Sequence, residues 1–314
     1  MKTNKDLKGK GEIRGDVHGK YYKTWAKYFV KFLEEYSSHK INFWGITIQN
    51  EPYDGTLDDF PFNCMAMSPE KQRDFIKFDL WPSLNESGFK DIKLMIGDEQ
   101  RPFLKKYAEV ILQDKDTAEL VAGVAFHWYM NRFTSPEILS NLTEEYKNYF
   151  FLSTEACEGS DPFEADKVIL GSWQRAENYA LDIIQDLSHN AAGWIDWNMA
   201  LDLEGGPNWA LNFVDSAIIV NATAGEYYKQ PMYYVLGHFS RYLPPGSLKL
   251  DTKITKLGDS GAIDGVFFST NNGTVAILLN RYENHIPVLL QDASIPGLAL
   301  DFTMLPKSIV TVLW

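Results

Sequence analysis

The chain has 314 residues, which is enough for one large domain with a smaller one beside it, or for two domains of ordinary size. Hydrophobic residues make up 45% and charged residues 23%, a composition typical of globular proteins. A formal net charge of −12 argues against a nucleic-acid-binding protein, because phosphate contacts need clustered Lys and Arg. The two cysteines, Cys64 and Cys157, exclude a disulfide scaffold, and no His or Cys spacing predicts a metal site. No apolar run is long enough for a transmembrane helix.

The first two thirds of the chain alternate between helical and strand patterns. Apolar residues recur every three or four positions over residues 20–40, which predicts an amphipathic helix. Ser68 followed by Pro69 predicts a helix start, and short apolar runs between polar residues predict buried parallel strands. In chain order, the patterns predict helices over 20–40, 68–84, 103–113, from 135–136 onward and over 176–187, and strands over 43–48, 92–97, 121–126, 149–154 and 193–197.

Five alternations of strand and helix favour a parallel α/β architecture, and both a barrel and an open sheet fit this pattern. No glycine-rich phosphate loop follows a strand, which disfavours a nucleotide-binding sheet. Beyond residue 198 the pattern changes, and residues 248–314 are typical of a small all-β domain with Asn271-Asn272-Gly273 as a hairpin turn. We expect a loop over 204–209, strands over 213–220, 265–269, 274–279 and 309–314, and one more helix over 231–242.

Two carboxylates lie directly after predicted strands, Glu51 and Glu155. Asp98 and Glu99 end another strand, and Asp196 lies within the last one. In barrels the active site is built at these strand ends, and glycoside hydrolysis needs two carboxyl groups there. The alternative is that Glu51 and Glu155 are structural carboxylates at strand–helix junctions, and spacing alone favours it.

His127 has the same ambiguity. A histidine after an apolar strand is more often a structural residue than a catalyst. With Trp128 and Tyr129 beside it, contact with sugar hydroxyls is the second interpretation.

Several longer segments resemble the lysosomal glucosylceramidases of glycoside hydrolase family 30, which belong to the clan of retaining (β/α)8 hydrolases. A lone Asn-Glu-Pro is shared by much of that clan, but the other motifs are more specific. The similarity runs from about Lys2 to Trp314. The segments that carry it are 43–52 (FWGITIQNEP), 53–73, 123–129 (GVAFHWY), 153–157 (STEAC), 193–198 (GWIDWN), 204–209 (EGGPNW), 212–216 (NFVDS) and 229–232 (KQPM).

The resemblance implies a fold with two parts. These are a partial (β/α)8 TIM barrel, equivalent to strands 4–8, over residues 1–198, and a C-terminal all-β sandwich over 246–314. A β excursion over 199–228 and the last barrel helix over 229–245 would connect them. The start of the chain resembles a segment just after the third barrel strand of the family. We therefore expect a fragment that lacks the signal peptide, an N-terminal β portion and three strands, and that is not active alone.

The resemblance also implies roles for individual residues. Glu51 would be the general acid/base and Glu155 the nucleophile of a β-glucosidase that hydrolyses glucosylceramide to glucose and ceramide by double displacement. Cys157 would lie near the site without chemistry. No cofactor and no metal are implied. The substrate-binding residues would be Asn50, Phe62, Gln100, His127, Trp128, Tyr129, Trp197 and Asn212.

Partners and location follow from the same resemblance. The family acts in the lysosomal lumen with a saposin-type activator and an anionic lipid surface. Sequons at Asn85, Asn141, Asn221 and Asn272 are weak evidence for a secretory route. Two other functions stay open: a family 30 hydrolase for another β-linked glycan, and an inactive relative that binds glycan or lipid.

Overall fold

The computed structural model describes residues 1–255 and 263–314 and divides into two compact units. The first unit contains Met1–Ala156 and His189–Ile195, and the second contains Cys157–Ser188 and Asp196–Trp314. Residues 256–262 of the predicted β domain lie outside the described residues.

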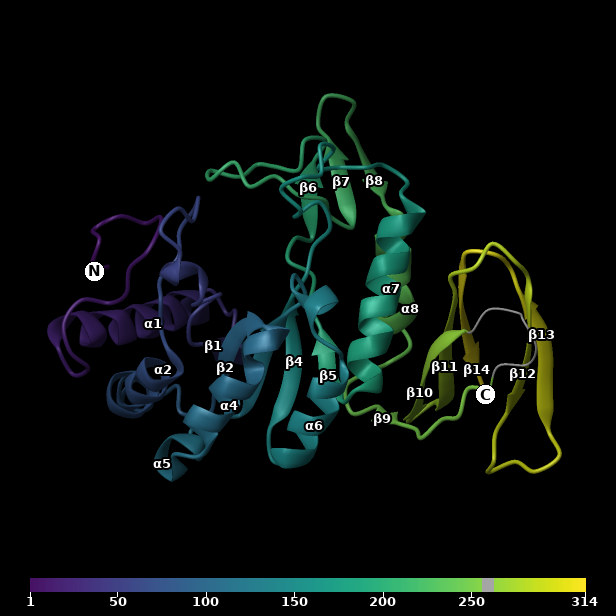
Figure 1. The fold of residues 1–314 in the computed structure, drawn as a ribbon, viewed down its shortest axis with the longest axis horizontal. Helices are drawn as coiled ribbons and strands as arrows, with labels where there is room; N and C mark the ends of the chain where they lie inside the picture. The colour runs from purple at the N-terminus through teal and green to yellow at the C-terminus, as the bar shows by residue number, and fades with distance from the viewer. Residues whose placement is uncertain (256–262) are drawn as a thin grey trace. The chain divides into compact units, whose positions relative to one another are not determined.

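The first unit is built on a five-stranded parallel sheet with the strands in chain order, as predicted (Figure 1). All residues of β3, and all of β2 except Lys93, are buried, which explains why these strands appear in the sequence as continuous apolar runs. The strands are β1 (Gly45–Thr47), β2 (Lys93–Gln100), β3 (Gly123–His127), β4 (Phe150–Glu155) and β5 (Ala191–Trp194).

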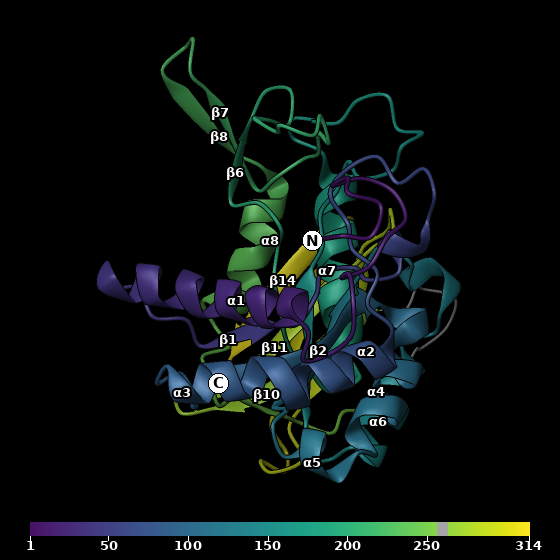
Figure 2. The same ribbon diagram turned by 90° about the vertical axis from the view of Figure 1, so that its left-hand side faces the viewer.

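Helices of the first unit follow the predicted order. In α1, Tyr22, Ala26, Val30 and Leu33 form the buried stripe that the sequence spacing predicts. The Ser68 side chain accepts a hydrogen bond from the Lys71 N–H and caps α2. α2, the π-helical segment η2 and α3 follow one another without a break and form one continuous helix (Figure 2). The helical elements are α1 (Lys20–Ser38), η1 (Asp54–Thr56), α2 (Pro69–Phe75), η2 (Ile76–Leu80), α3 (Trp81–Glu86), η3 (Arg101–Phe103), α4 (Leu104–Leu112), α5 (Lys115–Ala118), η4 (Asn131–Phe133) and α6 (Glu137–Glu145).

Two irregularities in the parallel sheet re-aim side chains at its carboxyl edge. In the pairing of β2 with β3, Gly97 and Glu99 pair with successive residues of β3, so Asp98 is an extra, unpaired residue on β2. In the pairing of β3 with β4, Ser153 and Glu155 pair with successive residues of β3, so Thr154 is the extra residue on β4. Gly97 has a φ of 82°, and a Cβ there would lie 2.9 Å from the Ala125 carbonyl oxygen. Bulges of this kind often occur next to functional sites, because they turn a side chain out of the regular alternation.

The second unit contains two helices and three small sheets. β7 pairs in parallel with β6 and antiparallel with β8. The strand predicted over 213–220 begins only at Ile218, because Asp215 and Ser216 make polar contacts that are incompatible with strand pairing. The prediction that Asp196 lies within the last barrel strand was wrong, since β5 ends at Trp194. The elements are α7 (Trp173–Ser188), β6 (Ala200–Asp202), β7 (Ile218–Asn221), β8 (Glu226–Lys229) and α8 (Pro231–Ser240).

The C-terminal strands form the predicted β-sandwich. Phe267, Ala276, Leu278 and Met304 form its buried core, against which apolar residues of both sheets pack. The hairpin turn predicted at Asn271-Asn272-Gly273 joins β10 to β11. One sheet contains β9 (Leu248–Lys249), β10 (Asp264–Thr270), β11 (Gly273–Asn280) and β14 (Ser308–Leu313), and the other contains β12 (Ile286–Gln291) and β13 (Ala299–Met304). Within the described ranges, no helix has both the length and the apolar character needed to cross a bilayer.

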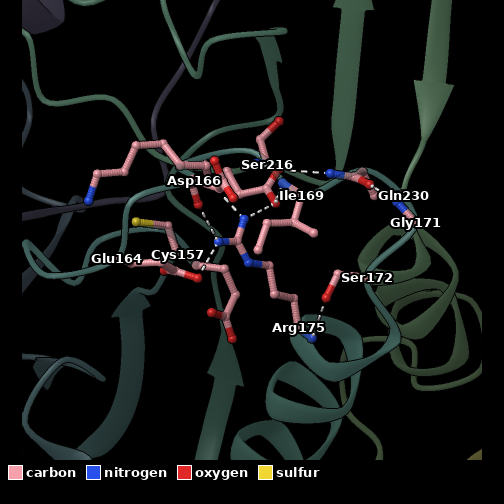
Figure 3. Close-up of polar contacts among 12 residues, drawn as sticks. Cys157, Glu164, Asp166, Ile169, Gly171, Ser172, Arg175, Ser216 and Gln230 are labelled. Carbon is pink, nitrogen blue, oxygen red and sulfur yellow. Dashed lines mark hydrogen bonds and ion pairs between the residues drawn. The ribbon is translucent and has the colours of Figure 1, made fainter.

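A buried ion pair organises the irregular part of the second unit. Arg175 of α7 pairs with Asp215 through Nη1 and with Glu164 through Nη2, at 2.6 Å, and also donates to the carbonyl oxygens of Lys167 and Asp166 (Figure 3). Its guanidinium thereby ties the segment that precedes α7 to the segment that precedes β7.

We expect the Arg175–Asp215 pair to be essential for the stability of the second unit. Both side chains are at most 3% exposed, so Arg175→Met leaves a buried carboxylate without its cation and should lower the free energy of unfolding by about 3–5 kcal/mol. The matched control is Arg281→Met, which removes a half-exposed pair with Asp264 and should cost under about 1 kcal/mol. Equal losses in urea unfolding experiments would contradict this assignment.

Candidate active site

Glu51 and Glu155 meet at the carboxyl edge of the parallel sheet. Glu51 follows β1 and Glu155 is the last residue of β4. Oxygen atoms of the two carboxyl groups lie within 4.8 Å of each other and of a His127 nitrogen. Glu51 Oε1 accepts hydrogen bonds from Gln100 Nε2 at 2.6 Å and from His127 Nδ1 at 2.8 Å, and Glu155 Oε1 accepts one from the Tyr129 hydroxyl at 2.9 Å. Two carboxyl groups at this spacing can act together on one bond of a bound molecule.

His127 connects the two carboxylates to a third, Asp98. The second ring nitrogen, Nε2, lies 3.1 Å from Asp98 Oδ1, and Nδ1 lies 3.9 Å from Glu155 Oε1. Burial lowers the pKa of His127, but hydrogen bonds and charge from Asp98, together with Glu51 and Glu155, outweigh it and raise that pKa well above its ordinary value. His127 is therefore a buried imidazolium that donates from both nitrogens.

Asp98 is the carboxylate that stays ionised. Its burial opposes the charged form, but His127 and the hydroxyls of Thr47 and Thr154, at 2.6 and 2.8 Å, hold its pKa below the ordinary value. Asp98 has a φ of 57° and Glu51 has a φ of 38°, both in the left-handed region. The Glu51 N–H donates to the Asp98 carbonyl at 2.8 Å. Such strained backbone persists only where the surroundings hold it, and it is common at functional sites.

Three further carboxyl groups near the site, those of Glu155, Glu99 and Asp54, bind protons more tightly than usual. Burial raises the pKa of Glu155 to about 7, against the opposing charge of His127 and the Tyr129 hydrogen bond. Burial likewise raises the pKa of Glu99 to about 7, and burial followed by the charge of Glu51 raises that of Asp54 to about 9. One edge of the sheet thus holds carboxyl groups with widely separated proton affinities, which is the pattern of acid–base sites.

The Glu51, His127 and Glu155 atoms are close enough together to surround a cation. However, both nitrogens of His127 face carboxylates and carry protons, so neither has a lone pair to give to a metal. The group suits proton transfer better than metal binding.

The structure brings together five of the predicted site residues, namely Glu51, Gln100, His127, Tyr129 and Glu155. Trp128 packs edge-on against Tyr129 and Trp194 in the same unit.

The remaining predicted residues make no contact with the two carboxylates that the structure records. Asn50 is exposed beside Glu51, and Phe62 packs edge-on against Phe60 in the loop between η1 and α2. Trp197 and Asn212 belong to the second unit, and their roles stay predictions.

Three residues of the site were not predicted as partners of the carboxylates. Thr47 and Thr154 are ordinary strand residues in the sequence, and only the pairing shift at Thr154 turns it toward Asp98. Asp54 lies three residues after Glu51 in a loop, where an acidic residue is unremarkable by pattern alone. Asp98 was noted as a strand-end carboxylate, but nothing local indicated its contact with His127.

Comparisons with known proteins place these features in a family context. A model of the glycosyl hydrolase family 30 TIM-barrel domain matches residues 1–243. Putative glucosylceramidase 4 of Caenorhabditis elegans is 43% identical and lysosomal acid glucosylceramidase of Mus musculus 41% identical, each over 317 residues that cover 100% of this chain and 60% of the relative. The crystal structure of SrfJ from Salmonella typhimurium matches with a TM-score of 0.86 at 28% identity, covering 100% of this chain and 66% of that one. The chain thus spans about 60% of the length of these curated relatives.

The Tyr129 hydroxyl should tune the proton affinity of Glu155. Because it donates to the ionised carboxylate, Tyr129→Phe should raise the pKa of Glu155 above its value of about 7, by about one unit. Carboxyl ¹³C NMR titration measures this shift. Tyr149→Phe, which removes a hydroxyl bonded to the Ala118 carbonyl, is the matched control and should leave Glu155 unchanged. A fall or no change in Tyr129→Phe would contradict the assigned hydrogen bond.

The raised carboxyl pKa values make the first unit more stable in acid. Glu155 and Glu99 have ordinary pKa values of 4.5 but about 7 in the folded chain, so the folded state binds more protons in this window. The free energy of unfolding should therefore fall from pH 4.5 to 7, by on the order of a few kcal/mol. Urea unfolding over a pH series measures it, and Glu155→Gln should flatten the slope. A free energy that rises over this window would refute the assignment.

Proposed function

Because the chain belongs to glycosyl hydrolase family 30, we propose that it carries the two reacting carboxyl groups of a retaining β-glucosidase. The observation that carries this proposal is the approach of the Glu51 and Glu155 oxygens to within 4.8 Å at the carboxyl ends of β1 and β4. Retaining enzymes hold their carboxyl groups roughly 5–5.5 Å apart, whereas inverting enzymes leave roughly 6.5–9.5 Å for a water molecule.

The reaction proceeds in two displacements. In the first, the Glu155 carboxylate attacks the anomeric carbon while the Glu51 carboxylic acid gives its proton to the leaving oxygen. The bond from sugar to leaving group breaks as the ester to Glu155 forms. In the second, Glu51 takes a proton from water, the water oxygen attacks the anomeric carbon, and the Glu155 carboxylate leaves.

The neighbouring side chains suit these roles. The Tyr129 hydroxyl stabilises the ionised form of Glu155 that attacks, and Gln100 and His127 hold Glu51 on the opposite side of the cleaved bond. Asn50, which precedes Glu51, would contact the sugar 2-hydroxyl, and Trp128 and Phe62 would offer flat apolar faces to the sugar ring. Roles for Trp197 and Asn212 in glucose binding rest on the family resemblance.

Glucosylceramide is the substrate that the similarity favours. Two relatives that match the whole chain at 41–43% identity are named glucosylceramidases, one of them lysosomal. We extend to this chain the lysosomal lumen as location, and a saposin-type activator and an anionic lipid surface as partners, because an amphiphilic lipid must be presented to a water-filled site. Another β-linked glycan as substrate, or a relative that only binds, are the alternatives.

The two carboxylates should respond differently to amide substitution in the full-length protein. Glu155→Gln removes the nucleophile and should abolish turnover of every β-glucoside. Glu51→Gln should slow glucosylceramide hydrolysis by about 10²–10⁴-fold. With an aryl glucoside whose leaving group needs no proton, however, the first displacement persists and a glucosyl adduct accumulates on Glu155. Steady-state kinetics and peptide mass spectrometry measure both effects.

Comparing glucosylceramide with β-glucan and xylan on the same protein decides the substrate. Glu119→Gln, an exposed carboxylate in the first unit, is the matched control and should keep full activity. Normal turnover by the Glu155→Gln variant would contradict the assignment of Glu155 as the nucleophile. A wild-type protein that binds glycans without cleaving them would favour the alternative function, an inactive relative that only binds.

A further inference from the structure

One oxygen of the Glu51 carboxyl group, Oε1, accepts two hydrogen bonds. The donors are Nε2 of Gln100 at 2.6 Å and Nδ1 of His127 at 2.8 Å. A carboxyl oxygen has two lone pairs, so two donors occupy both of them. Any proton that this carboxyl group binds is therefore carried by its other oxygen, Oε2.

In both contacts the proton belongs to the donor. The amide nitrogen of Gln100 can only donate. In His127, Nε2 lies 3.1 Å from Asp98 Oδ1, and a carboxylate is an acceptor only, so Nε2 carries a proton. The other ring nitrogen, Nδ1, faces Glu51 Oε1 at 2.8 Å and Glu155 Oε1 at 3.9 Å. Carboxyl oxygens on both sides of the ring favour an imidazolium, which donates from Nδ1 as well.

The backbone holds all three groups in this arrangement. Gln100 and His127 are paired residues at the ends of β2 and β3, so the two donors come from neighbouring strands. The Glu51 N–H donates to the Asp98 carbonyl at 2.8 Å, and the Glu51 carbonyl accepts from the Asp54 N–H at 3.0 Å. Gln100 is 8% exposed and His127 is 1% exposed, so packing restricts both donor side chains. The orientation of the Glu51 carboxyl group is thus set by its surroundings.

Burial distinguishes this role of Gln100 from the sugar contact that the family resemblance implies. Its amide oxygen, Oε1, is covered by protein atoms, so a sugar hydroxyl would have to reach an atom that is already shielded. The amide is also neutral, so it can donate to Glu51 whether that carboxyl group is protonated or ionised. A donor of this kind suits a group that changes its protonation state twice in each reaction cycle.

We infer that Gln100 is a positioning residue of the general acid: together with His127 it keeps Oε1 of Glu51 as an acceptor, so that Oε2 carries the proton that is donated. This inference rests on the proposed function. In the first displacement the Oε2–H bond breaks and its proton bonds to the leaving oxygen, which also takes the electron pair of its bond to the anomeric carbon. Glu51 is left as a carboxylate whose Oε1 still accepts from both donors. In the second displacement Oε2 takes a proton from water, and the electron pair of the ester bond returns to Glu155.

The test compares two leaving groups in the full-length protein and in its Gln100→Met and Gln100→Leu variants, which lack the donor. For an alkyl β-glucoside, whose leaving oxygen needs a proton, kcat/KM should fall by about tenfold in both variants. For a dinitrophenyl β-glucoside, whose leaving oxygen needs none, kcat/KM should change by less than about twofold, which also shows that the variants fold. Gln113→Met, which changes an exposed glutamine at the end of α4, is the matched control and should keep both values.

Two results of this comparison would overturn the inference. Equal losses with both substrates would mean that Gln100 binds the sugar or supports the fold. No loss with either substrate would mean that the general acid does not depend on the second donor to Oε1.

A further measurement needs no turnover and separates this inference from the proposed function. In ¹⁵N NMR of the wild-type protein, both ring nitrogens of His127 should carry protons from mildly acidic to neutral pH. A side-chain amide proton of Gln100 should lie downfield and lose this shift in the Glu51→Ala variant. An unprotonated Nδ1 would place the proton of Glu51 on Oε1 and overturn the inference, even in an active enzyme. The expected spectra in a protein that cleaves no β-glucoside would support the hydrogen bonds and refute the proposed function.

Discussion

The buried imidazolium of His127 is the interaction on which the carboxyl edge of the sheet depends. It is 1% exposed and lies between Asp98 on one side and Glu51 and Glu155 on the other. One cation cannot balance all the carboxyl groups gathered around it, and burying an unbalanced charge is costly. The site resolves this with protons: Asp98 keeps its charge, while Glu99, Glu155 and Asp54 have raised pKa values. Removing His127 would therefore change the ionisation of Asp98, Glu99, Glu155 and Asp54 together.

The contact between Asp98 and His127 depends on the register shifts in the sheet, which make the backbone irregular at Asp98. Asp98 and Thr154, the extra residues at two of the register shifts, lie on different strands, and the Thr154 hydroxyl donates to Asp98 Oδ1. Gly97 permits the turn before the first bulge with its positive φ, and Asp98 itself is left in a conformation that few L-residues adopt. A regular strand would point Asp98 and Thr154 in directions that preclude this contact. The backbone strain is balanced by hydrogen bonds that only this conformation allows.

The sequence predicts the regular elements and the main site residues, but not the irregular ones. β1 to β5 and the long helices were predicted because burial of one face, or of a whole strand, leaves a local pattern. β8, which is largely exposed, and β6, with three residues, leave no such pattern; the sequence named neither strand, although the family resemblance implied a β excursion over 199–228. Glu51, Glu155 and His127 could be named as candidates because each lies at the end of a predicted strand, but spacing alone favoured structural roles, and only the family resemblance implied chemistry. Asp54 could not be, because its place beside Glu51 depends on Gly55 meeting Ala66, a contact between segments that no local pattern records.

Chemically similar carboxyl groups are thus separated by their surroundings alone. Asp98 accepts three hydrogen bonds from side chains and stays charged, whereas Glu155 accepts one from Tyr129 and is dominated by burial. The protons that the raised carboxyls hold are the same ones that stabilise the first unit at low pH, since the folded chain binds them more tightly than the unfolded chain does. A crowded set of buried carboxyls is stabilised by retained protons, whereas a nucleophilic carboxyl must give its proton up before it attacks. Lowering the pH below about 7 therefore stabilises the first unit but protonates Glu155, whereas raising it weakens the fold and frees the carboxylate that attacks.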